Sequence, residues 1–241
     1  MNKLNKVPTV AEALSERARV LLDASSEGKP KRKGAIQIPQ GLVDSLSYHL
    51  GRGETHYPDR PGMADLRDMV GRELGKYLDD SRGGDQVLIT ASEGEAVFVT
   101  MLGLDLVPGG RVSGEKGLHH QKLFDWLGID VCGAEDMGIS IAYRELRGGA
   151  NMGSSSGGFE TEICALGDTL FGEEVTGLKF SPSTILLGSL SSLLGKHGFD
   201  LGFVSADTSV LKGITGWKQA SSICAPSPSQ RAALWALGER P

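Results

Sequence analysis

Several classes of protein are excluded by residues that this sequence lacks. Its three cysteines, Cys132, Cys164 and Cys224, are far apart and in no CxxC or Cys/His pattern. That scarcity argues against a disulfide framework and against a structural zinc site. No apolar run is long enough to span a bilayer, and the N-terminus has no stretch of signal-peptide type. We therefore expect a cytoplasmic protein with no membrane partner.

Positive charge is also in short supply. The 25 lysines and arginines are outnumbered by 30 acidic residues, which gives a formal net charge of -5. Such a balance offers no basic surface for a nucleic-acid backbone, so no nucleic-acid partner is expected. The basic run at residues 29–33 is short and broken by proline, and we interpret it as a solvated loop. Glycine, in contrast, is abundant at 34 residues and predicts many tight turns.

The first part of the chain is predicted to be helical. Apolar residues recur at helical spacing over residues 9–22, and a polar Gly/Pro-containing linker follows. We therefore divide the chain into an N-terminal helix and linker, residues 1–34, and a main domain, residues 35–241. Two further helices are predicted at residues 41–50 and 62–78.

From residue 86 onward, short β-branched runs alternate with helical patterns. This alternation is the signature of an α/β fold with a mostly parallel sheet and right-handed crossovers. The Gly/Ser-rich residues 148–158 have no periodicity and are predicted to form a flexible loop. Strands are predicted at residues 86–91, 111–112, 129–132, 184–189 and 201–205, and helices at 92–106, 118–127 and 227–237.

Three separated segments have the spacing of functional motifs. They are YPDRPG with a following Leu66-Arg67, ITASEGEA with a following VPGG, and GSLSSLLGKHGFDLG at residues 188–202. In the second segment a helix is predicted to begin directly after a strand, at Ser92, Glu93 and Gly94. Its free N–H groups and positive dipole end would suit a phosphate. The alternative interpretation of Ser92 is a plain N-cap.

In this order, the three segments resemble the fold type I, class I/II aminotransferases, which depend on pyridoxal phosphate. The resemblance covers roughly residues 36–237 and implies a three-layer α/β/α large domain, with the small C-terminal domain missing. It also implies an amino acid or keto acid as substrate, and a homodimer. In such a dimer Tyr57 would reach across the interface to the cofactor phosphate; the alternative for Tyr57 is a partly buried loop aromatic.

The resemblance carries a set of cofactor-binding residues onto this chain. Glu93 is unusual among them, because its carboxylate would repel a phosphate unless it points away. His119 falls near the family's ring-stacking aromatic, although a solvent-facing histidine is an equal alternative. The expected set is Tyr57, Ser92, Glu93, Gly94, His119, Tyr143, Ser189 and Ser191.

Several parts of the family's machinery are not found. Ser192 occupies the position of the lysine that binds the cofactor covalently, and Asp200 occupies that of a phosphate-binding arginine. A serine hydroxyl cannot form an imine, so any bound cofactor would be held non-covalently. The family's strands carrying an asparagine and an aspartate are not found between Val131 and Ser140. The missing central strand would leave a gap or an exposed edge in the sheet.

Three hypotheses remain at this stage. The first is a degenerate aminotransferase homologue without transaminase activity. The second is an enzyme that binds a preformed aminated cofactor and uses His119 or His197 as its acid–base group. The third is an ordinary active aminotransferase in which Lys196, another lysine or a partner chain supplies the missing part.

Overall fold

The computed structural model describes residues 37–78, 82–115, 117–133, 136, 138–146, 159–170, 179–194 and 197–238. The helix and linker predicted over residues 1–34, the loop predicted over residues 148–158, and Lys196 all lie outside these ranges. The division of the chain at residue 34 therefore stays a prediction. None of the helices in the described ranges has the length and apolar character needed to cross a membrane.

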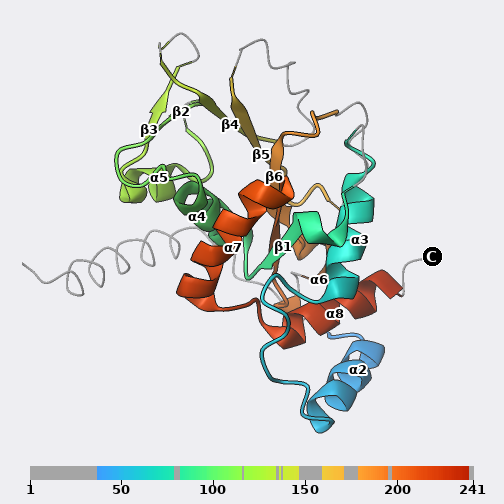
Figure 1. Ribbon diagram of the computed structural model, residues 1–241. Helices are drawn as coiled ribbons and strands as arrows, with labels where there is room; N and C mark the ends of the chain where they lie inside the picture. Colours follow the sequence, from blue (N-terminus) through green and yellow to red (C-terminus); the bar gives the residue numbers. More distant parts are fainter. Residues whose placement is uncertain are drawn as a thin grey trace, which may run out of the picture. The chain divides into compact units, whose positions relative to one another are not determined.

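A seven-stranded sheet organises the part of the chain from Ile38 onward, with its strands in the order β1-β7-β6-β5-β4-β2-β3 (Figure 1). Every neighbouring pair is parallel except the two that involve β7, which runs antiparallel to β1 and β6. The predicted mostly parallel sheet is thus confirmed. The strands are β1 Val87–Thr90, β2 Arg111–Ser113, β3 Asp130–Cys132, β4 Ile141–Glu145, β5 Thr161–Ala165, β6 Ile185–Ser189 and β7 Gly202–Ser205.

The sheet has a hydrophobic core on each face, because successive side chains of a strand point to opposite sides. In β1, Leu88 packs into one core while Val87 and Ile89 pack into the other. β7 divides in the same way, with Phe203 on one face and Val204 on the other. Strands that are buried on both faces read as continuous apolar runs, and this is why β1, β6 and β7 were predictable from sequence.

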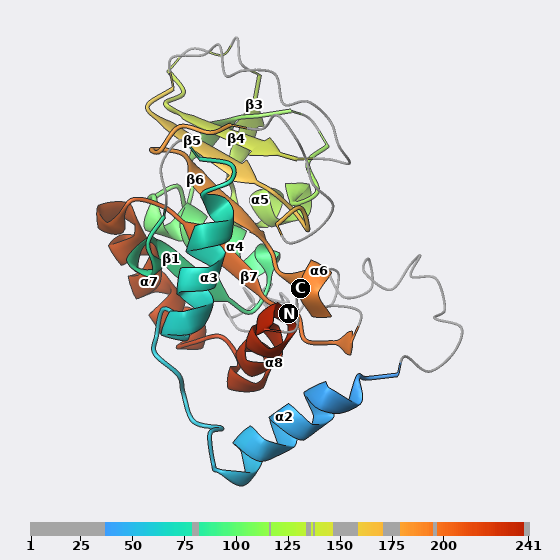
Figure 2. The same cartoon turned by 90° about the vertical axis from the view of Figure 1, so that its right-hand side faces the viewer.

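Helices cover both faces, which gives the expected three layers (Figures 1 and 2). α4, α5 and α7 pack into the core that contains Leu88, and α3, α6 and α8 pack into the opposite core. α2 lies against α8, where Gly41 faces the ring of Trp235. The helices are α2 Gln40–Gly51, α3 Ala64–Leu74, α4 Glu93–Gly103, α5 Gln121–Leu127, α6 Ser191–Leu194, α7 Thr208–Ser222 and α8 Ser227–Gly238, with a 3-10 turn at Gly84–Gln86.

The prediction of a gap in the sheet is wrong. β4 and β5 lie between β2 and β6 and pair in parallel along their length, so no central strand is absent. β5 was not predicted from the sequence because Glu162 interrupts its apolar pattern. In the structure that charge is paired with Arg144 of β4, at 3.2 Å between Arg144 Nε and Glu162 Oε1. The sequence also gave no prediction for α7, whose glycines and β-branched residues lower its helix propensity.

Candidate functional site

The site lies at the carboxyl edge of the sheet, where the parallel strands end together. The chain leaves β2 toward β3 on one side and then returns to β4 on the other side of β2. In open α/β sheets, such a reversal opens a crevice that commonly binds ligands. A cavity of about 500 Å³ is present here, and its polar lining consists of Glu93, His119, His120, Glu145, Gly167 and Asp168.

The first turn of α4 forms one edge of this region. Ser92 caps the helix, since its Oγ accepts a hydrogen bond from Glu95 N at 3.1 Å. The interpretation of Ser92 as an N-cap is therefore confirmed. Gly202 of β7 packs directly beneath, where a Cβ would lie 2.4 Å from the Ser92 carbonyl carbon. At Gly94, in contrast, a Cβ would meet only Ser92 Oγ at 3.7 Å, so space does not require a glycine there.

Glu93 is directed into the cavity. Its Oε1 accepts a hydrogen bond from Gly167 N at 3.1 Å, which ties α4 to the end of β5. Burial raises the pKa of the Glu93 carboxyl, while nearby His120, the bond from Gly167 and His119 oppose that rise. A phosphate at this helix start would require the Glu93 carboxylate to point away from the cavity, and the structure has it pointing inward.

A hydrogen-bonded network forms the wall on the β4 side. The nearly buried carboxylate of Glu145 accepts from the backbone N–H of His119 at 2.5 Å and of His120 at 3.1 Å. The same carboxylate lies 3.1 Å from His120 Nδ1, which fixes the ring of His120. His119 packs edge-on against that ring, with centroids 4.8 Å apart.

Tyr143 belongs to the same network but lies behind it. Its side chain is fully buried, and its hydroxyl is 3.3 Å from both Glu145 Oε1 and His120 Nδ1. Burial and the charge of Glu145 raise the pKa of this phenol, so it is a neutral donor to the carboxylate. Tyr143 does not line the cavity, and a role for it would be to hold Glu145 and His120 in place.

The two serines predicted to bind the phosphate are bonded to each other. Ser189 Oγ donates to Ser191 Oγ at 2.7 Å and accepts from Ser191 N at 2.9 Å. Ser191 Oγ in turn donates to a carboxylate oxygen of Asp200. Ser192, at the lysine position, is exposed and donates to the Leu170 carbonyl at 2.8 Å. These hydroxyls are therefore engaged within the chain.

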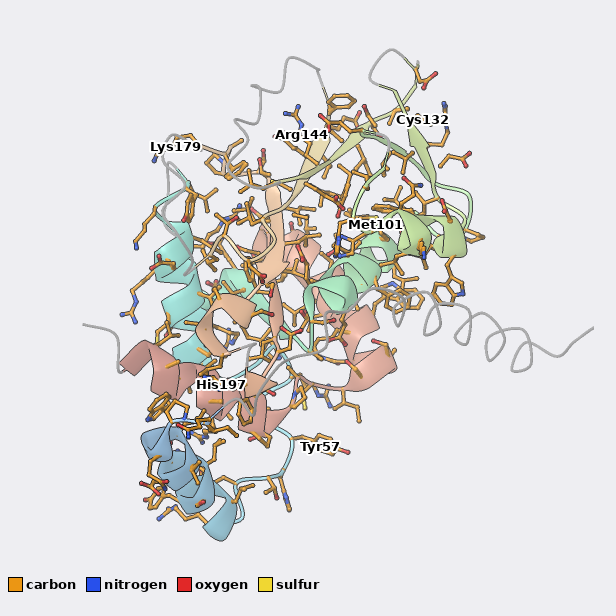
Figure 3. The ribbon with its side chains drawn as sticks, turned by 180° about the vertical axis from the view of Figure 1, so that it is seen from behind. Tyr57, Met101, Cys132, Arg144, Lys179 and His197 are labelled. Atoms are coloured by element: carbon orange, nitrogen blue, oxygen red, sulfur yellow. The ribbon has the colours of Figure 1, made fainter. Side chains whose placement is uncertain are left out.

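Tyr57 lies apart from the cavity. Its side chain is 76% exposed in the loop between α2 and α3 and points away from the body of the protein (Figure 3). The alternative of a partly buried loop aromatic is wrong, because so exposed a ring has little packing within its own chain. Its cross-interface role stays a prediction.

The structure brings together only part of the predicted set. Glu93 and His119 line the cavity, while Ser92 and Ser189 lie at the same edge without lining it. Sequence reasoning missed His120, Glu145 and Asp168. A signal was available for Asp168, which follows β5 within three residues, as expected for a polar group at the carboxyl end of a buried strand. Within the described ranges, no cluster of His, Cys, Asp and Glu has the arrangement of a metal site.

Comparison with known proteins gives a match by structure alone. Neither a protein-family model nor a curated protein sequence matches the chain. Among solved structures, a Methanococcus jannaschii protein described as similar in its active site to kynurenine aminotransferases superposes with a TM-score of 0.71 at 19% identity. That match covers 99% of this chain and 73% of the other.

Two further solved structures agree. Thermus thermophilus aspartate aminotransferase with maleate matches with a TM-score of 0.70 at 16% identity, over 98% of this chain and 73% of that one. N-succinyldiaminopimelate aminotransferase from Mycobacterium tuberculosis matches with a TM-score of 0.69 at 16% identity, over 94% and 70%. Identities this low establish the fold, and they leave the chemistry of the site to be argued from its own residues.

Proposed function

We propose that this chain, which has the aminotransferase fold, does not catalyse transamination and uses the cavity at its carboxyl edge to bind a small molecule. The observation that carries this proposal is at residue 192. A serine hydroxyl stands at the position that matches the cofactor-binding lysine, and it is already bonded to the Leu170 carbonyl. An alcohol cannot condense with an aldehyde to form an imine, so the first requirement of the family's chemistry is not met there.

The side chains around the site do not fit pyridoxal phosphate. The N–H groups at the start of α4 could meet its phosphate, but binding a dianion also calls for cationic side chains beside them. Here Glu93, Glu145 and Asp168 line the cavity, and its described lining includes no lysine or arginine. Asp200 accepts from Ser191, so a phosphate at the serines would meet a carboxylate. At a separation of 4 Å, two like charges near a protein surface repel by about 4 kcal/mol.

One residue does suit the cofactor. Asp168, at the end of β5, is the kind of acidic group that would keep a pyridine nitrogen protonated, and the sequence had been expected to lack it. A pyridine ring beside Asp168 would still leave its phosphate without a cationic partner. The balance of these groups therefore favours a cavity that has lost the cofactor.

Reduction with borohydride tests the proposal directly. Purified protein is incubated with pyridoxal phosphate, its absorption spectrum is recorded, and it is reduced and digested for mass spectrometry. We expect no band of a lysine-bound cofactor and only scattered, substoichiometric adducts, equal to those on the urea-unfolded chain. One stoichiometric adduct on Lys196, or on any other single lysine, would establish the active-aminotransferase hypothesis and refute ours.

One observation bears on the hypothesis of an enzyme that binds a preformed aminated cofactor. Of the two histidines considered for its acid–base group, His119 lines the cavity and His197 does not. Such an enzyme would convert added pyridoxamine phosphate and a keto acid to products with a change in the cofactor spectrum. We expect a flat spectrum, because the carboxylates of the cavity oppose binding of the phosphate.

The homodimer implied by the resemblance also belongs to the proposal. The 76% exposure of Tyr57 supports it, because a large aromatic side chain gains most from burial against another surface. Light scattering coupled to size exclusion should give twice the mass of the chain. A monomer at micromolar concentration would count against the role assigned to Tyr57.

A further inference from the structure

The cavity has the size of a small-molecule site and is formed by several strands. Its volume of about 500 Å³ lies within the range of known ligand pockets, roughly 300–1,000 Å³. Its walls come from the start of α4, the segment after β2, and the ends of β4 and β5. Because these segments are bonded to one another through Glu93, Gly167 and Glu145, the walls are held in place.

The carboxylates of the cavity differ in how far they are already satisfied. Glu145 is saturated by the backbone and ring of His120, by His119 and by Tyr143. Glu93 has one oxygen bonded to Gly167 N, and within the described part of the chain no donor reaches its other oxygen. Asp168 has no hydrogen bond to any described residue. One oxygen of Glu93 and the carboxylate of Asp168 thus line the cavity without a donor from the described part of the chain.

The nearby histidines do not cancel this charge. His120 is held by Glu145, so the pair is neutral overall when the imidazole is protonated and negative when it is not. His119 is exposed to solvent. The cavity therefore favours ligands with positively charged N–H donors and repels anions.

We propose that the cavity binds a small organic ammonium ion, with its N–H groups donating to Glu93 and Asp168. Glu93 is the deeper anchor, because its bond to Gly167 already fixes the carboxylate in a partly buried position. An α-amino acid would bind more weakly than a simple amine, since its own carboxylate faces Glu93 and Asp168. The inference rests on the proposed function only in that the cavity is free of pyridoxal phosphate.

Calorimetric titration tests this inference with three probes at low salt and pH 7.5: 1,4-diaminobutane, glycine and inorganic phosphate. We expect diaminobutane to bind, glycine to bind more weakly, and phosphate to give no heat. Binding of diaminobutane should weaken as the ionic strength rises, because the contact is between charges. No diaminobutane binding, or phosphate binding as tight as that of the amine, would overturn the inference.

Matched variants locate the binding. Glu93→Gln keeps an oxygen that can accept from Gly167 N and removes the carboxylate. Asp168→Asn removes the carboxylate of an exposed residue and keeps the size of its side chain. Each should weaken diaminobutane binding about tenfold, as loss of one charge-assisted hydrogen bond predicts. Asp44→Asn on α2 makes the same change of charge away from the cavity and should bind as the parent does. Equal affinities for Glu93→Gln and Asp44→Asn would show that the cavity is not the site.

The two proposals fail in different ways. A stoichiometric lysine adduct, together with diaminobutane binding by the protein before cofactor is added, would refute the proposed lack of transamination and leave the ammonium site of the cofactor-free protein standing. The absence of both an adduct and diaminobutane binding would refute the ammonium site alone. Thermal melting of each variant confirms that lost binding does not come from unfolding.

Discussion

The contact between Gly202 and the first turn of α4 allows a quantitative test of how the site is held. A methyl group at Gly202 would lie 2.4 Å from the carbonyl carbon and oxygen of Ser92 and 2.6 Å from Glu93 N. These are backbone atoms of a turn whose Ser92 carbonyl accepts two hydrogen bonds. Thr90 Oγ donates to the Ser92 carbonyl at 2.8 Å, and Ala96 N donates to the same oxygen at 3.1 Å. Gly202→Ala must therefore push β7 and α4 apart.

The expected cost follows from overpacking in a close-packed interior. Inserting a methylene group into a core commonly costs 1–3 kcal/mol, and rigid backbone neighbours place Gly202→Ala near the upper end, at about 3 kcal/mol. For a domain of this size, that corresponds to a fall in melting temperature of roughly 6–12 °C. Urea denaturation with an unchanged m value measures the free energy directly.

Gly216→Ala is the matched control for this substitution. Gly216 lies within α7, and a Cβ built there meets no atom within 4 Å. The same chemical change should therefore raise stability by about 1 kcal/mol through helix propensity. If Gly202→Ala unfolds within about 0.5 kcal/mol of the parent, the size of an ordinary surface substitution, then the close approach of β7 to α4 is not what holds this edge of the site.

Three further predictions follow from individual contacts. Ser92→Ala should cost about 1 kcal/mol in urea denaturation through loss of the N-cap, with diaminobutane affinity unchanged; weakened ligand binding would instead make Ser92 a ligand group. The pKa of Glu93 is raised above 4.5 in the folded state, so at pH values just above 4.5 the folded state binds more protons than the unfolded state does. The free energy of unfolding of the parent therefore falls as the pH rises through this window. The stability of Glu93→Gln relative to the parent should accordingly rise over the same window in urea titrations at a series of pH values, and a constant difference would contradict the raised pKa. Tyr57→Ala should shift the light-scattering mass toward the monomer while changing the free energy of unfolding of the isolated monomer by no more than about 0.5 kcal/mol; an unchanged dimer would exclude Tyr57 from the interface.

The parts of the fold that were predictable from sequence are those with local signals. β1 reads as an apolar β-branched run, and α4 follows it behind a capping serine, so both could be placed from neighbouring residues alone. β5 could not, because the charge of Glu162 is compensated by Arg144 on another strand. A sequence pattern shows the charge of Glu162 but does not show that a residue on another strand pairs with it.

The same limit applied to the site. Glu145 lies 25 residues from His120, and the two meet only because β2 and β4 are paired in parallel, with Ser113 opposite Ala142. Glu93 and Gly167 are 74 residues apart and meet across the strand ends. The family resemblance named Glu93 and His119, which line the cavity, but the charge of their surroundings is set by residues that no single motif contained.

Placing a lysine at position 192 tests separately the two features on which the proposed lack of transamination rests, the hydroxyl at 192 and the carboxylates of Glu93 and Asp200. Ser192 is exposed and its hydroxyl makes one hydrogen bond, so Ser192→Lys should cost only about 1 kcal/mol of stability. We expect that variant to take up pyridoxal phosphate weakly, because Glu93 and Asp200 still oppose the phosphate. Adding Glu93→Gln and Asp200→Arg should increase uptake at least tenfold in spectrophotometric titration, since one charge-assisted contact is worth about that factor. If Ser192→Lys alone bound the cofactor stoichiometrically, the carboxylates would not oppose binding, and the serine at 192 would by itself account for the proposed lack of transamination.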